Sequence, residues 1–225
     1  MVLGSAGESI PDDNASRVQR IQSPIPEAEV VRFLKITARL PDKEPPTFSP
    51  LTESFYADDP ADRLIDSCRA RFEKQFDVVR QGKIWKQNRA IRSAAAREGR
   101  STTELAGVMS ALSTAICRAQ IEDIKELKQL ERKGEKETAR LKKKLDLIDQ
   151  RLSQQKTTVL SRQRTELAIK LSRNVALVEY LKVLQEVPEE NIALVRRYHE
   201  ELAMLVDQTA LDNLAPKSLT AAFDE

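Results

Sequence analysis

The sequence has few of the residues from which catalytic and metal sites are built. Its 225 residues include one histidine, His199, two cysteines and six glycines. A single histidine leaves almost no choice of proton carrier at neutral pH, and a zinc site needs several His or Cys ligands. The run GRSTTELAG has neither the lysine nor the spacing of a phosphate-binding P-loop. We therefore predict that the protein is not an enzyme and holds no metal or cofactor.

Long apolar runs and targeting signals are also missing. No stretch approaches the roughly 20 apolar residues of a membrane span. The start, MVLGSAGESIPDDN, lacks the basic residues and apolar core of a secretory signal. We expect an intracellular protein, cytoplasmic or nuclear. Cys68 and Cys117 are far apart and form no Cys-x-x-Cys motif, so we expect both to be reduced packing residues.

Aromatic residues make up only 4% of the chain, which is few for a β-rich or α/β domain. The dominant residues are instead Ala, Leu, Lys, Arg, Glu and Gln, the composition of long helices. The predicted fold is all-α: an elongated helical bundle or coiled coil with a disordered N-terminal arm.

The prolines divide the chain, because eight of the ten lie at or before Pro60. Residues 1–59 are rich in Ser, Pro, Asp and Glu and are predicted to form a mostly disordered arm. A short helix near 27–40 interrupts this arm and must dock on the body or on a partner, because a lone helix of about 14 residues is marginal. The remaining chain is predicted to form a long helical coiled-coil region at 60–187, a C-terminal helix at 188–214 and a tail at 215–225.

Apolar residues alternate at spacings of three and four along the helical region, which keeps one stripe facing a partner helix. Asn174 lies within the last stripe, where it either fixes the register of a seam or sits at its wet edge. In the charged run 131–140 the helix either turns back near Gly134 or continues as a solvated segment. The predicted coiled-coil seam consists of Leu105, Val108, Leu112, Leu141, Leu145, Ile148, Leu152, Leu167, Leu171 and Val178.

Charge is unevenly distributed although the total is nearly neutral, with 37 basic and 35 acidic residues. The segment 80–100 has seven basic residues against Glu98 alone. In one continuous helix, five of them would lie within about a third of the circumference. This basic face is either an ordinary solvated surface, an internal partner for the acidic C-terminal region, or a binding surface. The candidate binding residues are Lys83, Lys86, Arg89, Arg97 and Arg100.

The arm contains one short motif. Ser23-Pro24-Ile25-Pro26 resembles the Ser-x-Ile-Pro peptide by which many proteins bind end-binding proteins at growing microtubule ends. The resemblance covers four residues and implies a cytoskeletal partner bound through Ser23, Ile25 and Pro26.

These features favour a non-enzymatic coiled-coil structural or adaptor subunit of a larger assembly. We expect protein partners through the seams, as a homo- or hetero-oligomer, and an acidic protein surface on the basic helix. The alternative is a nucleic-acid-binding protein whose helix 80–100 contacts backbone phosphates without reading sequence. Membrane binding ranks last, because few large apolar residues lie opposite these charges.

Overall fold

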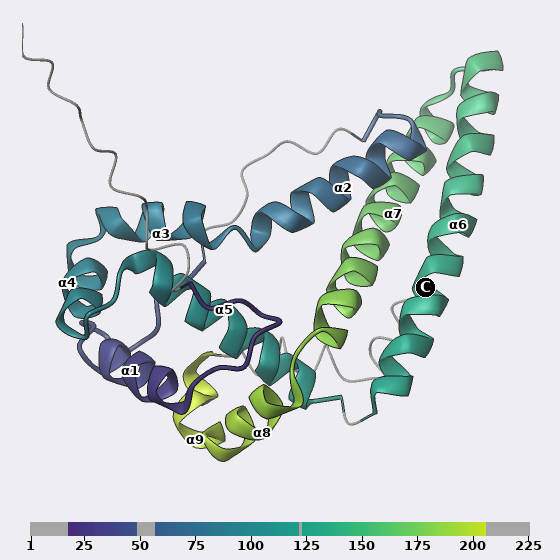
Figure 1. The fold of residues 1–225 in the computed structure, drawn as a ribbon. Coiled ribbons are helices and arrows are strands. Elements are labelled where there is room, and N and C mark those ends of the chain that lie inside the picture. The colour runs from purple at the N-terminus through teal and green to yellow at the C-terminus, as the bar shows by residue number, and fades with distance from the viewer. Residues whose placement is uncertain (1–17, 49–56, 122, 206–225) are drawn as a thin grey trace, which may run out of the picture.

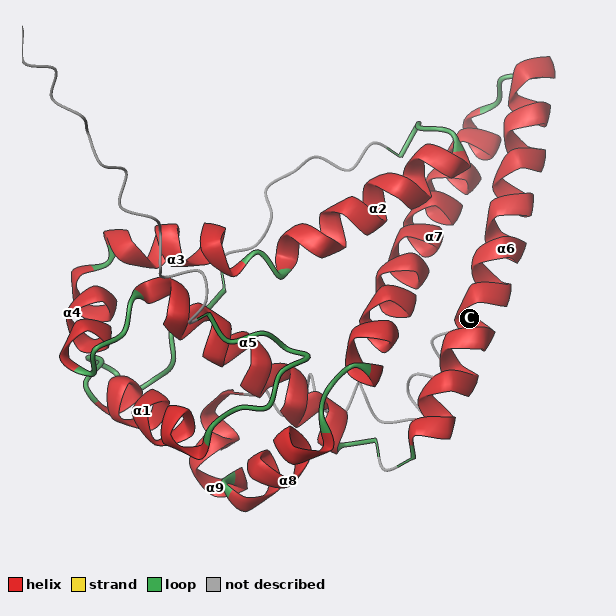
Figure 2. Cartoon of the chain, viewed as in Figure 1, coloured by secondary structure: helices red, strands yellow, loops and turns green. Residues whose placement is uncertain are grey.

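The computed structural model describes residues 18–48, 57–121 and 123–205 (Figure 1). All regular secondary structure in these ranges is helical (Figure 2), which confirms the all-α class. The helices are α1 (Glu27–Ala38), α2 (Ala61–Gln75), α3 (Val78–Gln87), α4 (Arg89–Arg97), α5 (Thr102–Ala119), α6 (Ile124–Gln154), α7 (Thr158–Gln185), α8 (Glu189–Arg197) and α9 (His199–Leu202), followed by the 3₁₀ turn η2 (Ala203–Leu205).

A helical body surrounds α5, with α1, α3, α4, α8 and α9 packed around it (Figure 1). The helix begins at a capping box, in which Ser101 accepts from the Glu104 amide and Glu104 accepts from the Ser101 amide. Small residues let neighbouring segments approach closely. A Cβ on Gly107 would lie 2.8 Å from the backbone oxygen of Gln19, so the segment before α1 lies directly against α5.

A long antiparallel hairpin of α6 and α7 projects from this body, with α2 packed along α7 (Figure 1). Leu145 of α6, Leu171 of α7 and Leu64 of α2 are almost fully buried and form the core of the hairpin. At its tip, the buried guanidinium of Arg164 donates to the backbone oxygens of Ala57 and Asp59 and pairs with Asp149. These contacts fix the start of α2 to the hairpin. A further apolar cluster joins hairpin and body: Ile121, Leu127, Leu130, Leu181 and Leu184.

The predicted seam residues pack within the chain itself. Three of them belong to the core of the body: Leu105, Val108 and Leu112. Four are buried in the hairpin: Leu141, Leu145, Leu171 and Val178. Three more are half-buried along the hairpin: Ile148, Leu152 and Leu167. The three-four spacing thus reflects helix packing inside one chain.

The predicted coiled-coil region 60–187 is divided into six helices rather than built as one long rod. Short polar side chains start several of them by accepting from exposed amides. Asp77 caps α3, Asn88 caps α4, Asp123 caps α6 and Thr157 caps α7. Each cap accepts hydrogen bonds from the first backbone amides of a new helix, which have no partner within that helix, and so allows the chain to change direction there.

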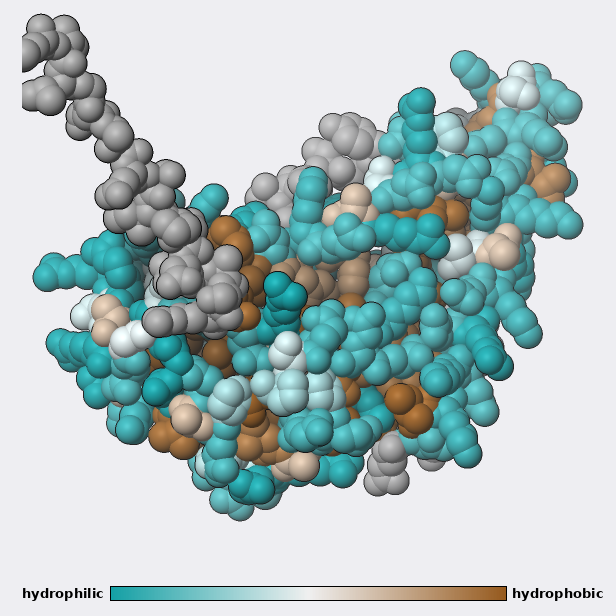
Figure 3. All heavy atoms as spheres, viewed as in Figure 1, coloured by the Kyte–Doolittle hydropathy of each residue, from teal (hydrophilic) through white to brown (hydrophobic). Residues whose placement is uncertain are grey.

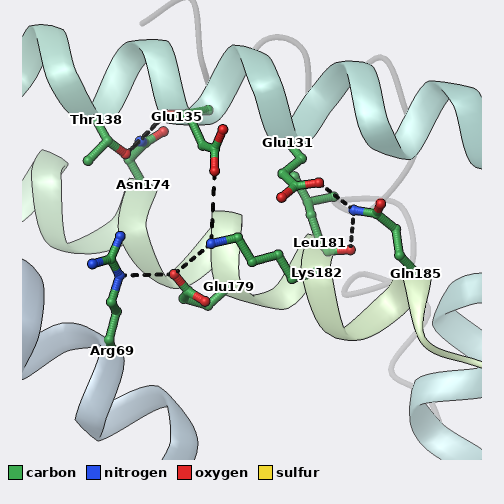
Figure 4. A network of polar contacts seen from close by, with 10 residues as sticks. Arg69, Glu131, Glu135, Thr138, Asn174, Glu179, Leu181, Lys182 and Gln185 are labelled. Carbon is green, nitrogen blue, oxygen red and sulfur yellow. Dashed lines mark hydrogen bonds and ion pairs between the residues drawn. The ribbon is translucent and has the colours of Figure 1, made fainter. Parts of the chain in front are cut away.

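Helix α6 continues through Gly134, so the chain turns back after Gln154 and not at the glycine. Asn174 of α7 is buried against this point. Its side-chain amide donates to the Gly134 oxygen at 2.9 Å and to the Thr138 hydroxyl at 2.6 Å. Charged contacts extend along the same interface: Lys182 lies 3.2 Å from Glu179 and 3.9 Å from Glu135, and Arg69 of α2 donates to Glu179 (Figure 4).

The helix expected near 27–40 is present as α1, whereas other parts of the two ends differ from the sequence prediction where they are described. Residues 18–48 pack on the body, and the helix expected near 27–40 docks there through Val30, Phe33 and Ile36. The predicted C-terminal helix is interrupted at Tyr198, whose hydroxyl donates to Glu27. Residues 206–225, including the predicted tail, lie outside the described residues.

Candidate basic binding site

The continuous basic helix expected at 80–100 is not formed. Helix α3 ends at Gln87, and Asn88 adopts an extended backbone with φ −80° and ψ 115°. Its side-chain oxygen accepts from the Ala90 and Ile91 amides and starts α4. The angular spacing of one helix therefore does not apply across Asn88, and the basic residues lie on two helices of different direction (Figure 1).

A pocket of about 530 Å³ opens between α3, α4 and the start of α5. Three of the five predicted binding residues line it: Lys83, Lys86 and Arg100. Arg92, which the single-helix geometry had excluded, joins them from α4. Its guanidinium donates to the backbone oxygen of Lys86 at 2.9 Å, across the break between the helices.

The other two predicted residues, Arg89 and Arg97, do not line the pocket. Both are exposed on α4, at the outer edge of the body. Figure 3 shows hydrophilic side chains along this edge. The structure thus divides the predicted basic face into a pocket and a flanking surface.

Arg100 already has acidic partners. It donates to both carboxylate oxygens of Glu29 on α1, and its guanidinium lies 3.6 Å from Glu104. The hydrogen bond to Glu29 is the main reason why the pKa of Arg100 is raised above its ordinary value. Arg100 thus joins α1 to the start of α5, and its acidic partners among the described residues are Glu29 and Glu104.

The described residues offer the two lysines no such partner. Lys83 and Lys86 are exposed on α3, and in the ranges that the structure describes neither pairs with a carboxylate. Arg100 is neutralised, so among the described residues the positive charge of the pocket without an acidic partner is located at Lys83, Lys86 and Arg92.

Gly82 brings these lysines to the start of α5. A Cβ at this position would lie 2.3 Å from the Thr103 hydroxyl and 2.6 Å from the Thr103 Cα. Its backbone oxygen accepts a 2.7 Å hydrogen bond from the Thr102 hydroxyl. Only glycine allows this approach, which places Lys83 beside the helix end that carries partial positive charge.

The Ser-x-Ile-Pro motif is part of the body. Ile25 is 6% exposed, and its amide donates to the buried side chain of Asn191. Asn191 also donates to the Ser23 oxygen, and Pro26 directly precedes α1. A partner that recognises the isoleucine would first have to remove this segment from the core.

The described residues contain no group of His, Cys, Asp and Glu side chains suited to a metal ion. No helix among them has the length and apolar character needed to cross a membrane. The single histidine, His199, is exposed on α9.

Comparison with known proteins finds no matching family model, no similar curated protein and no similar solved structure.

Proposed function

We propose that the protein is a non-enzymatic helical adaptor subunit, which binds an acidic surface of a partner protein through α3 and α4. The observation that supports this proposal is the set of basic side chains around Asn88 that have no acidic partner among the described residues. In the described part of the chain, no carboxylate pairs with Lys83, Lys86, Arg89 or Arg97. Some basic residues elsewhere do have acidic partners, as Arg39 has in Glu98 at 2.7 Å. Unmatched cations on one surface attract an acidic partner.

The predicted seam residues are buried within the chain, which limits the surfaces that a partner can bind. Leu145 and Leu171 are fully buried inside the hairpin, so they offer no apolar surface to a second chain. We therefore assign partner binding to the charged surface instead of the seams. The projecting α6–α7 hairpin provides a second surface, apart from α3 and α4 (Figure 1). An adaptor that joins two partners needs two such surfaces.

The alternative of nucleic-acid binding receives less support. Sequence-independent contact with a phosphate backbone favours a row of cations that follows the strand. The break at Asn88 removes the continuous row, and four of the seven basic residues of segment 80–100 line a pocket. Nucleic-acid binding would appear in the pull-down as loss of the bound proteins after nuclease treatment.

The test is a pull-down with the tagged full chain, in nuclease-treated and untreated halves, with bound proteins quantified by mass spectrometry. The variant Lys86→Glu/Arg89→Glu is compared with Lys143→Glu/Lys144→Glu, a control with the same charge change on exposed positions of α6. We expect a stoichiometric protein set that survives nuclease, is retained by the control and is lost from the α3–α4 variant. Loss of the set with nuclease, or its retention by both variants, would contradict the proposal.

A further inference from the structure

We propose that the pocket between α3, α4 and α5 binds a phosphate monoester. Lys83, Lys86 and Arg92 would hold the phosphate at the start of α5. This inference deepens the proposed function and rests on it, because it names the anionic group that the partner presents.

The basic groups converge on the pocket from two helices. Lys83 and Lys86 are three residues apart on α3 and so lie on one side of that helix. Arg92 approaches from α4, and its bond to the Lys86 oxygen holds the guanidinium beside the lysine. A guanidinium has five N–H donors, so this one bond leaves others for a ligand.

Helix α5 contributes the third side of the pocket. Ser101, Thr102 and Thr103 line it. The Thr102 hydroxyl is committed to Gly82, and the Ser101 amide is committed to Glu104. The first amides of a helix have no partner within it, so the Thr102 amide is suited to donate to an anion, whereas the Thr103 nitrogen lies against Gly82.

The charge balance favours a phosphate over a carboxylate. A phosphate monoester carries about −1.5 to −2 charges and three acceptor oxygens at neutral pH. The pocket offers three cations that have no acidic partner in the described part of the chain, from Lys83, Lys86 and Arg92. A carboxylate has one charge and two oxygens and would leave part of this positive charge unmatched.

Size and position favour a single group over a polymer backbone. The volume of about 530 Å³ is within the range of small-ligand sites. Two carboxylates behind Arg100, those of Glu29 and Glu104, are mostly buried and repel an anion that goes deeper. The phosphate is therefore placed toward Lys83 and Lys86, at the open side.

The experiment is an NMR titration of the ¹⁵N-labelled full chain with three probes: inorganic phosphate, N-acetyl-phosphoserine amide and the unphosphorylated N-acetyl-serine amide. We expect saturable shifts of the Thr102 amide with both phosphate probes and none with the serine probe. Shifts that are absent, or equal for the phosphorylated and unphosphorylated probes, would overturn the proposal.

Two variants locate the charge that matters. Lys83→Gln/Lys86→Gln removes two charges from the pocket, and Arg89→Gln/Arg97→Gln removes two from the flanking surface of α4. The first should weaken phosphate binding about tenfold or more, as expected for lost charge-assisted bonds, and the second less than about twofold. Equal weakening in both would show general electrostatic attraction only. The near-ultraviolet signal of Trp85, the one tryptophan of the chain, checks that each variant is folded.

This experiment is separable from the pull-down. Phosphate binding without a nuclease-resistant protein set would refute the adaptor function and leave the site intact. A protein set that depends on α3 and α4, without phosphate binding, would refute the phosphate site and leave the adaptor function intact. A single-stranded oligonucleotide that lacks a terminal phosphate serves as a further probe. If it binds more tightly than phosphoserine amide and is weakened by both variants, the site is a nucleic-acid surface and the proposal fails.

Discussion

The backbone amide of Ile25 donates a 2.7 Å hydrogen bond to the side-chain oxygen of Asn191, which is 166 residues away in the chain. The side-chain nitrogen of Asn191 in turn donates to the Ser23 oxygen at 3.0 Å. Asn191 is fully buried, so one side chain holds an extended segment of the N-terminal region against α8. In this way the two ends of the described chain stabilise one body.

Replacing Asn191 should destabilise this body. Asn191→Ala removes both hydrogen bonds and leaves the buried Ile25 amide without a partner, at a cost of about 2–4 kcal/mol. Thermal denaturation followed by circular dichroism measures the loss. Gln22→Ala is the control, because it removes an exposed bond to Glu186 close to the same segment. Similar melting temperatures for the two variants would contradict the assigned role of Asn191.

The hairpin offers a matched pair of leucines. Leu145 of α6 is fully buried between α7 and α2, whereas Leu147, two residues later, is 47% exposed. Leu145→Ala should lower the free energy of unfolding by about 2–5 kcal/mol, and Leu147→Ala by less than about 1 kcal/mol. Chemical denaturation gives both values, and size-exclusion chromatography shows whether either variant changes the state of assembly. Loss of assembly with unchanged stability in Leu145→Ala would instead indicate a seam between chains.

The helical class and much of the core could be predicted, because apolar spacing depends on which face a helix buries. The spacing does not show whether the facing helix belongs to the same chain. Leu145 and Leu171 satisfy the same pattern whether they meet within one hairpin or between two molecules. The decisive information lies in the turn at residues 155–157 and in the docking of α2, which depend on tertiary contacts.

The sequence predicts only part of the candidate site, because the helix break at Asn88 was not anticipated. Lys83, Lys86 and Arg100 were identified as basic residues of one face, and they do line one pocket. The prediction of a continuous helix is wrong; it leaves out Arg92 and includes Arg89 and Arg97, which do not line the pocket. Asn88 was the available signal, since a short polar residue capable of capping can begin a new helix. Its extended backbone turns α4 away from α3.

The two cysteines should react slowly in the folded protein. Burial raises the pKa of the Cys117 thiol, although a hydrogen bond with Tyr180 opposes the rise. Because the thiolate is the reactive form, a raised pKa lowers its population at neutral pH. Cys68 is buried and lies 3.0 Å from the Ser172 hydroxyl. Iodoacetamide labelling followed by mass spectrometry should show little modification at pH 7.5 and two modified cysteines in denaturant. Rapid labelling of the native chain would contradict the packing described.

Glu29 should make the stability of the protein depend on pH in the acidic range. Burial alone would raise the pKa of Glu29, but the neighbouring Arg100 and Arg32 outweigh it and lower the pKa below its usual value. A carboxylate with a lowered folded pKa stabilises the protein fully above its unfolded pKa, near 4.3. That contribution is lost as the pH falls through the folded pKa.

The variant Glu29→Gln isolates this contribution. Near pH 7 it should be less stable than the natural sequence by about 2 kcal/mol, because bonds to charged groups are lost. The difference should shrink below about pH 4, as Glu29 becomes protonated in the natural protein. Urea denaturation at several pH values measures it. Glu166→Gln removes the exposed pair with Arg162 and should show little difference at any pH. A stability contribution from the charge of Glu29 must change with pH as the carboxylate becomes protonated. If the stability difference between Glu29→Gln and the natural protein were constant from pH 7 to pH 3, neutral packing and not charge would explain the role of this residue.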